Sequence, residues 1–331
     1  MLTYIARRLV AMFGLLVALS IVTFLLFSAL PADPAALTCG KSCTPEVIQA
    51  NRVRLGLDKP LTEQYVTFVK GLFVGRDFDG GAGVISCPAP ALGYSFFKQE
   101  CVTTLITGAL PVTLALALGA FVLWMIFGNI SGVIAALRRG TVVDRGLTGF
   151  ALIGYSFPSF FIAQLFIFIL VIKWGWLPGN LQAYSPFAEN PSVWIQKMLI
   201  GWVVLALIFA AFYTRLTRNQ MLETLGEDFI RTARAKGLSE RRVIGKHGLR
   251  AGLTPVVTAA GLDLGGLLGG AVIAETVLNL PGVGQLALTS VTQSDLPVIT
   301  GTVLLAASFI IMSNLVVDVL YAAIDPRVRL S

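Results

Sequence analysis

The sequence predicts an all-α integral membrane protein with six membrane-spanning helices. Of its 331 residues, 56% are hydrophobic and only 13% are charged, and the mean hydropathy is +0.80. Soluble domains carry charge on about a quarter of their residues. The hydrocarbon core of a bilayer needs about 20 consecutive apolar residues per helix. Six runs reach that length: Leu9–Leu30, Ala109–Leu137, Leu147–Ile172, Val193–Tyr213, Leu253–Leu278 and Leu296–Ile324.

Basic residues concentrate in alternate connections between these runs, and this pattern orients the chain. Connections rich in lysine and arginine face the cytoplasm, so with six spans both termini lie on that side. The short loops of the opposite side hold only Lys173 and Lys197. The long segment 31–103 holds seven basic residues, but long segments are translocated largely regardless of charge. The expected cytoplasmic basic residues are Arg7, Arg8, Arg138, Arg139, Arg145, the nine lysines and arginines from Arg215 to Arg250, Arg327 and Arg329.

The net charge of +7 comes mainly from these cytoplasmic connections. It indicates topology and contact with anionic lipid rather than nucleic-acid binding. Two arginines precede the first run, as in a secretory signal. At about 22 residues, however, the run is longer than the usual apolar core of a signal peptide. We therefore expect it to remain as the first span.

All four cysteines, Cys39, Cys43, Cys87 and Cys101, fall in the segment 31–103. This partition predicts an oxidising compartment and two disulfides, with three pairings open. A four-thiolate zinc site is the competing interpretation, although its ligands usually arrive as two close pairs and Cys87 and Cys101 are far apart.

The same segment contains a predicted short helix at 45–52 and a glycine-rich stretch around Asp79–Gly81. It therefore reads as a small folded cap. Disulfides either simply staple such a cap or hold it to contact a ligand or a ligand-carrying protein outside, and the two readings are compatible.

The connection between the fourth and fifth runs has a helical pattern of apolar and charged residues. Glu227 and Asp228 open a first helix, and Gly237 provides a left-handed C-terminal cap. Ser239 is a suitable N-cap for a second helix. The pattern fits an amphipathic helix on anionic headgroups or a helix that docks in a protein groove. The expected apolar anchors are Phe229, Ile230, Leu238, Val243 and Ile244.

The fifth run repeats glycine at every fourth residue, at Gly261, Gly265 and Gly269. Small residues at this spacing let helices approach closely in lipid, either as a static seam or along a moving interface. Ionisable residues inside spans are costly, so Asp263 and Asp318 are candidates for a pathway or for pairing between helices. Glu275 lies nearer the external face, as a candidate gate or contact for a docked protein.

The residues of this chain do not suggest covalent chemistry. The sequence has one histidine, His247, which rules out the usual triad and zinc ligand sets. It also lacks the Gly-x-x-x-x-Gly-Lys-Ser/Thr loop that cradles nucleotide phosphates. We expect no catalytic residue, cofactor or metal in this chain.

The loop between the fourth and fifth runs resembles the coupling loop of permeases in bacterial ABC importers, specifically the B-type subunits for oligopeptides and dipeptides. Gly237, Ala233 and Leu249 match the glycine, second alanine and leucine of the general family pattern. The general pattern is not met at Arg231, Thr232, His247 and Arg250, but 230–238 closely resembles the peptide subfamily's version.

The resemblance covers nearly the whole chain and is most specific in its last two segments. The cysteine-bearing insertions depart from it, as does a fourth span without an opening Leu-Pro. The matching segments are Tyr4–Leu9, Leu55–Pro60, Ser131–Ala136, Phe157–Phe160, Glu275–Leu286 and Val317–Arg327.

The resemblance implies the six-helix fold of a type I ABC importer permease. Its expected parts are an N-terminus and first helix (1–30), an extracytoplasmic cap segment (31–103), and a permease core (104–331) with a cytoplasmic coupling loop (217–252). It further implies a second permease subunit as heterodimer partner, two ATPase subunits that bind ATP and Mg²⁺, and an extracytoplasmic peptide-binding protein. The implied contacts with the ATPases are Phe229, Ile230, Arg231, Thr232, Ala233, Arg234, Ala235, Lys236, Gly237 and Leu238, with Ala233 and Gly237 as the points of closest approach.

The predicted function is translocation of peptides across the bacterial inner membrane, driven by ATP hydrolysis in partner subunits. Two alternatives stay open at this point. One is an importer of the same family for nickel or another small solute. The other is an ATP-independent secondary transporter, which the coupling loop and the lack of a detectable internal repeat disfavour.

Overall fold

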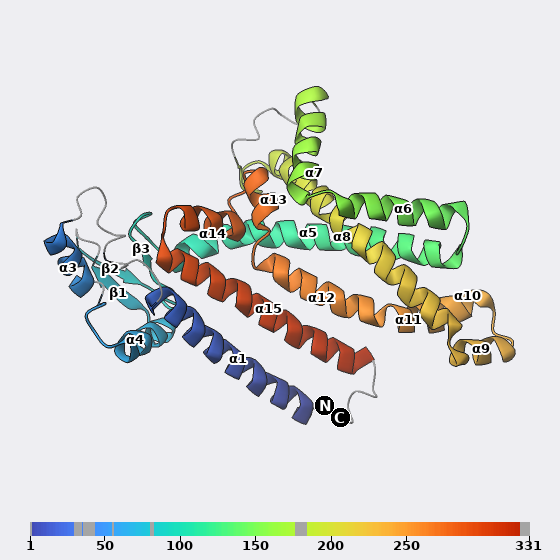
Figure 1. Ribbon diagram of the computed structural model, residues 1–331, viewed down its shortest axis with the longest axis horizontal. Helices are drawn as coiled ribbons and strands as arrows, with labels where there is room; N and C mark the ends of the chain where they lie inside the picture. The colour runs from blue at the N-terminus through green and yellow to red at the C-terminus, as the bar shows by residue number, and fades with distance from the viewer. Residues whose placement is uncertain are drawn as a thin grey trace.

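The computed structural model describes residues 2–29, 35, 44–54, 56–79, 83–175 and 184–324, and it is predominantly helical (Figure 1). Long helices lie side by side along one axis, with a small α/β cap at one end and a short helical loop at the other. The first half contains α1 (Leu2–Ala29), α3 (Pro45–Arg54), α4 (Leu61–Val74), β1 (Arg76–Asp79), β2 (Val84–Cys87), β3 (Tyr94–Ser95), β4 (Glu100–Cys101), α5 (Val102–Leu137), α6 (Val142–Ser156), α7 (Ser159–Phe166) and the π-helical η1 (Ile167–Lys173). The second half contains α8 (Pro191–Gly226), α9 (Asp228–Ala235), α10 (Glu240–Arg242), the π-helical η2 (Val243–Gly248), α11 (Leu249–Gly252), α12 (Thr254–Leu268), α13 (Val272–Val277), α14 (Val283–Thr292) and α15 (Leu296–Ile324).

Within the described residues, four helices are long and apolar enough to cross a membrane, and two bent helix pairs bring the number to six if each pair is one span. The four helices correspond to the first, second, fourth and sixth predicted runs. One bent pair, Val142–Ser156 with Ser159–Lys173, covers the third run, and the other, Glu240–Gly252 with Thr254–Leu268, overlaps the fifth run only from Leu253 to Leu268. The straight spans are Ala6–Leu26, Val102–Leu137, Pro191–Gly226 and Leu296–Val319.

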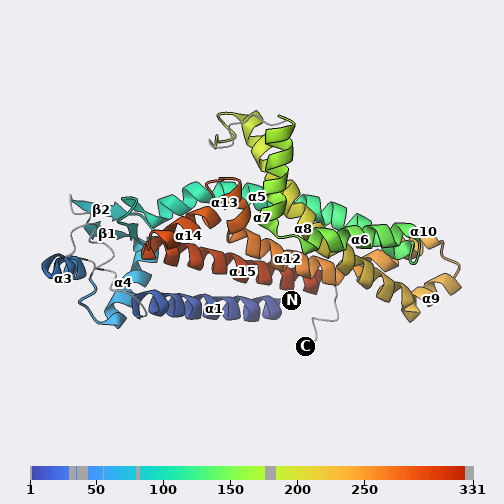
Figure 2. The same cartoon turned by 45° about the horizontal axis from the view of Figure 1, so that its top comes forward.

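The third predicted span is bent by 98° between α6 and α7, and this departs from the continuous run Leu147–Ile172. The cause is Pro158. A proline disfavours the helical conformation of the residue before it, and Phe157 is extended at φ −90° and ψ 137°. As a result α7 projects from the side of the helical bundle (Figure 2).

The fifth predicted span also ends early. The helix α12 stops at Leu268, and Gly270 adopts φ +129°, a conformation that favours glycine. A Cβ atom on Gly270 would lie 2.8 Å from the backbone of Gly284. The chain therefore turns tightly into α13 instead of continuing the helix.

The core of the bundle is the long contact between α5 and α8. Trp124 of α5 is fully buried and stacks on Phe209 of α8, with ring centroids 4.4 Å apart. A Cβ atom on Gly128 would lie 2.7 Å from Tyr213 Cβ, and one on Gly132 would lie 2.6 Å from Thr217 Cβ. Two glycines one turn apart therefore let α8 approach the backbone of α5, as small residues do in membrane helices.

The cap contains the predicted short helix, observed as α3, together with α4 and two antiparallel hairpins, β1–β2 and β3–β4. A disulfide joins Cys87 of β2 to Cys101 of β4. This bond uses two of the four thiols, so a four-thiolate zinc site is ruled out. Cys39 and Cys43 lie outside the described residues.

Contacts with the first span and with the residue before the last span anchor this cap. The hydroxyl of Tyr65 in α4 hydrogen-bonds that of Ser20 in α1 at 2.8 Å. Ser95 of β3 donates a hydrogen bond to the carboxylate of Asp295, which directly precedes α15. Burial raises the pKa of Asp295, and the hydrogen bond from Ser95 opposes that rise.

Candidate functional site

The predicted coupling loop is a short helix, α9, at the end of the molecule opposite to the cap (Figure 1). The helix α8 runs unbroken for 36 residues to Gly226, and after Glu227 the chain turns into α9. Asp228 opens the helix, as expected for an acidic residue at the positive end of the dipole. The loop thus follows directly on a helix that belongs to the core of the bundle.

Gly237 terminates α9 as predicted, at φ +75°. The N–H of Leu238 donates to the carbonyl of Ala233 at 3.3 Å, and the N–H of Gly237 donates to that of Arg234 at 2.9 Å. These two bonds form a Schellman motif, which satisfies carbonyls at a helix C-terminus. Ser239 then occupies the N-cap position of α10, although its side chain makes no capping hydrogen bond.

The inner face of the loop is a small buried cluster. Ile230 and Val243 are fully buried, Ala233 is nearly so, and Leu238 packs against them. Ile230 and Val243 were expected to be apolar anchors for docking, but both side chains are buried inside the loop. They instead hold α9 against η2, because the loop is short and needs its own apolar core. Ala233, which the resemblance implied as a point of closest approach to the ATPases, is buried in the same cluster.

The outer face of α9 is exposed and basic. Phe229 is 45% exposed, and Arg231, Lys236 and Gly237 are exposed as well. Arg231 pairs with Asp228 within the helix at 3.2 Å. This face combines one aromatic side chain with cationic groups, which suits docking into a groove of another protein.

A second ion pair joins α9 to α10. The guanidinium of Arg234 donates two hydrogen bonds to the carboxylate of Glu240, at 2.6 and 3.4 Å. The bond to Glu240 raises the pKa of Arg234. Arg234 thus belongs to the internal architecture of the loop as well as to its basic surface.

Gly261, Gly265 and Gly269 of the fifth run face α15. A Cβ atom on Gly261 would lie 2.0 Å from Val317, one on Gly265 would lie 2.5 Å from Ser313, and one on Gly269 would lie 2.7 Å from Ala306. These three positions form a seam in which the two helices touch through their backbones and small side chains. Gly266, on another side of α12, has nothing within 4 Å of its Cβ position.

The aspartates of the fifth and sixth runs pair with other helices. Asp263 of α12 accepts a hydrogen bond from the hydroxyl of Tyr213 in α8, at 2.6 Å. Asp318 of α15 forms a salt bridge with Arg8 of α1, at 2.9 Å. Both carboxylates thus link elements that are distant in sequence.

Glu275, the candidate gate or contact for a docked protein, is fully buried. Its carboxylate accepts hydrogen bonds from Thr113 of α5 at 2.8 Å and from the backbone N–H of Gln285 at 2.9 Å. The turn beside this carboxylate has no room for a side chain at Gly282, because a Cβ atom there would clash with the carboxyl group of Glu275. In this arrangement the carboxylate caps α14 and faces no outside partner.

One buried ion pair was missed by sequence reasoning. Asp144 of α6 is almost fully buried and accepts two hydrogen bonds from Arg218 of α8, at 2.6 and 2.9 Å. It also accepts the backbone N–H of Gly140 at 2.9 Å. The sequence did contain one sign of this ion pair: Asp144 is an acidic residue at the start of α6, in a connection whose other charged residues are basic. Its partner was not identifiable, because Arg218 is 74 residues away.

These features define a multi-span membrane protein with a folded cap at one end and an exposed basic helix at the other. The chain matches the family model of the binding-protein-dependent transport system inner membrane component over residues 128–330, and the model of its N-terminal part over residues 1–117. It therefore belongs to this family, as a multi-pass permease subunit of the inner membrane.

Individual relatives and one solved structure agree with this assignment. The chain is 38% identical to the glutathione transport system permease protein GsiC of Escherichia coli, over 99% of both chains. It is 35% identical to the di/tripeptide transport system permease protein DppB of Pseudomonas aeruginosa, over 99% of both. A chain of the inward-facing methionine ABC transporter MetNI shares the fold, with a TM-score of 0.52 and 21% identity over 67% of this chain and 97% of that chain. These similarities do not favour a self-sufficient secondary transporter.

Proposed function

We propose that this chain is one of two permease subunits of an ATP-driven importer that carries peptides across the inner membrane. The relatives described above are named for glutathione and for di- and tripeptides, and they match almost the full length. Neither name mentions nickel, so a peptide importer is the better-supported reading. The chain provides the pathway and leaves covalent chemistry to its partners.

The observation that carries this proposal is the division of α9 into two faces. Its inner face is locked by the buried cluster of Ile230, Ala233 and Val243, whereas Phe229 and Arg231, on either side of Ile230, are exposed. Because the buried cluster holds α9 to the rest of the loop, the helix can transmit force without unfolding. ATPase subunits that grip the outer face and close on ATP and Mg²⁺ would move α8, shifting the balance between inward-open and outward-open states.

The orientation follows from the same proposal. The loop end and both termini lie in the cytoplasm, and the cap lies outside, where the disulfide Cys87–Cys101 suits an oxidising compartment. A binding protein delivers the peptide to this side. We assign Gly261, Gly265 and Gly269 to a fixed seam between α12 and α15. We assign Glu275 to the protein interior next to α14, where it caps that helix.

The test is ATP-dependent peptide uptake by liposomes that hold this chain with the permease, ATPases and binding protein of neighbouring genes. Arg231→Glu reverses a charge on the outer face of α9, so we expect it to reduce both uptake and retention of the ATPases. Lys173→Glu reverses an exposed charge outside the loop and should change neither. Uptake by this chain alone, indifferent to ATP and to Arg231, would overturn the proposal.

A further inference from the structure

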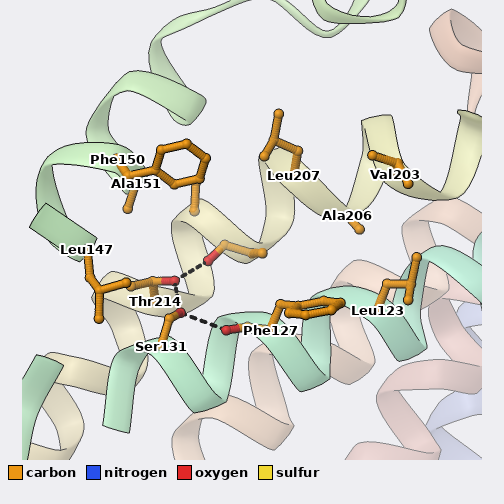
Figure 3. A pocket seen from close by; sticks show the side chains of 12 residues that line it. Leu123, Phe127, Ser131, Leu147, Phe150, Ala151, Val203, Ala206, Leu207 and Thr214 are labelled. Carbon is orange, nitrogen blue, oxygen red and sulfur yellow. Dashed lines mark hydrogen bonds between the residues drawn. The ribbon is translucent and has the colours of Figure 1, made fainter. Parts of the chain in front are cut away.

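An apolar groove of about 350 Å³ lies in the membrane core between α5, α6 and α8 (Figure 3). Leu123 and Phe127 of α5, Phe150 of α6, and Val203 and Leu207 of α8 line it. Phe127 and Phe150 are 62% and 64% exposed, so the groove opens to the side of the helical bundle. Its size falls in the range of about 300–1,000 Å³ that small-molecule sites occupy.

The two hydroxyl groups in the groove are already engaged. Ser131 and Thr214 hydrogen-bond each other at 2.6 Å. A carbonyl of its own helix also lies 2.7 Å from each hydroxyl, Phe127 for Ser131 and Ala210 for Thr214, so one hydroxyl donates to the other and the second donates to its carbonyl (Figure 3). A polar ligand would therefore find its partners taken, whereas a hydrocarbon chain would lose nothing by lying against this surface.

One end of the groove leads to a group of arginines. Arg138 stands seven residues beyond Ser131 in α5, which is about 10 Å along the helix axis. Arg215 directly follows Thr214 in α8, and Arg145 lies two residues before the groove residue Leu147 in α6. All three are exposed. The neighbouring carboxylate of Asp144 is bound by Arg218, so the field at this end is positive.

We propose that this groove is a binding site for an anionic membrane phospholipid. One acyl chain fills the groove, and the phosphate lies near Arg138 and Arg215. An apolar slot open toward the lipid, with cations at one end only, has the polarity of a phospholipid with a negatively charged headgroup. Basic residues near an anionic membrane surface each strengthen binding by roughly fivefold. The inference goes beyond the proposed transport function and requires only that the chain spans a membrane.

The test is native mass spectrometry of the assembled transporter after exchange into equimolar phosphatidylglycerol and phosphatidylcholine. We expect retained phosphatidylglycerol to exceed phosphatidylcholine by at least about tenfold, from two or more basic residues. The double variant Arg138→Gln and Arg215→Gln should bring the ratio close to one, and because both side chains are exposed it should fold normally. Val203→Phe, which fills the groove, should reduce retention of both lipids. Leu152→Phe, on the exposed side of α6, is the matched control and should behave as the native chain.

Two results would overturn the proposal. One is equal retention of the two lipids by the native chain, or a preference that survives the double arginine variant. The other is lipid retention by the isolated chain that disappears on assembly, which would show that another subunit covers the groove. Neither result depends on whether the transported solute is a peptide.

Discussion

The hydroxyl of Thr113 in α5 donates a hydrogen bond to the carboxylate of Glu275 in α13, 2.8 Å away and 162 residues later. The same hydroxyl accepts the backbone N–H of Val283 at 2.8 Å, and the second carboxylate oxygen accepts the N–H of Gln285. The buried charge therefore sits at the N-terminus of α14, where the helix dipole favours an anion. One side chain on α5 thus fixes the position of a helix near the other end of the sequence.

Replacement of Thr113 by valine should destabilise the fold, because the hydroxyl both donates and accepts a buried hydrogen bond. We expect a cost of about 1–3 kcal/mol in the free energy of unfolding. Thr107→Val is the control, since its exposed hydroxyl bonds only to Thr104 of the same helix. Melting temperatures of the purified transporter in detergent, followed by circular dichroism, measure the difference. Equal melting temperatures for the two variants would contradict the structural role of Thr113.

Tyr213→Phe should also lower the melting temperature, because it leaves the carboxylate of Asp263 without the hydroxyl that contacts it. The expected loss is about 1–3 kcal/mol, as for other hydrogen bonds to charged groups in a protein interior. Tyr155 is 57% exposed on α6, so Tyr155→Phe is a matched removal of a hydroxyl. Melting temperatures of both tyrosine variants equal to that of the native protein would contradict a stabilising hydrogen bond between Tyr213 and Asp263.

The seam between α12 and α15 makes opposite predictions for two adjacent glycines. Gly265→Ala places a methyl group 2.5 Å from Ser313 Cβ and should cost about 1–3 kcal/mol through overpacking. Gly266→Ala meets open space and should be neutral or stabilising by up to about 1 kcal/mol, since alanine favours the helix. Thermal melts of the two variants decide this, and a stable Gly265→Ala variant would mean that the helices are not held this closely.

Two neighbouring side chains of α9 should differ in what they support. Ile230→Ala removes a fully buried side chain and should cost about 2–5 kcal/mol of loop stability, so hydrogen exchange across residues 228–248 should accelerate. Phe229→Ala should leave exchange unchanged but weaken retention of the ATPase subunits, if the proposed docking holds. Hydrogen–deuterium exchange and co-purification provide the two readouts. The opposite result, faster exchange in Phe229→Ala and loss of the ATPases in Ile230→Ala, would contradict the roles assigned to these two side chains.

Asp295 should contribute a pH dependence of defined sign. Because burial raises its pKa in the folded state above the ordinary 3.8, the folded protein binds this proton more tightly than the unfolded chain does. The contribution of Asp295 to stability is therefore fully present below pH 3.8 and declines as the pH rises through its raised folded pKa. The measurement is the melting temperature of the native protein minus that of the Asp295→Asn variant, followed over a range of pH. This difference reports the contribution of Asp295 to stability. A difference that grows with pH would have the wrong sign and refute the assignment.

Local sequence patterns were sufficient to predict several structural elements. Four of the six apolar runs coincide with the four straight candidate spans, because about 20 apolar residues have few alternatives in a bilayer. Gly237 was predicted to end a helix, and its φ of +75° agrees because that position needs a left-handed residue. The bend at Pro158 was missed, although the proline that causes it is visible in the sequence.

Long-range contacts account for what sequence reasoning missed. The periodicity of 229–244 identified apolar side chains in the loop but not which of them face each other, so Ile230 and Val243 were taken for anchors when they form its core. The partners of Asp144 and Glu275 lie 74 and 162 residues away, respectively. Composition and spacing are properties of neighbouring residues, and they establish membrane insertion, helix limits and the resemblance to permeases. Only the folded chain decides which buried charge meets which donor, because those pairings depend on how helices distant in sequence pack together.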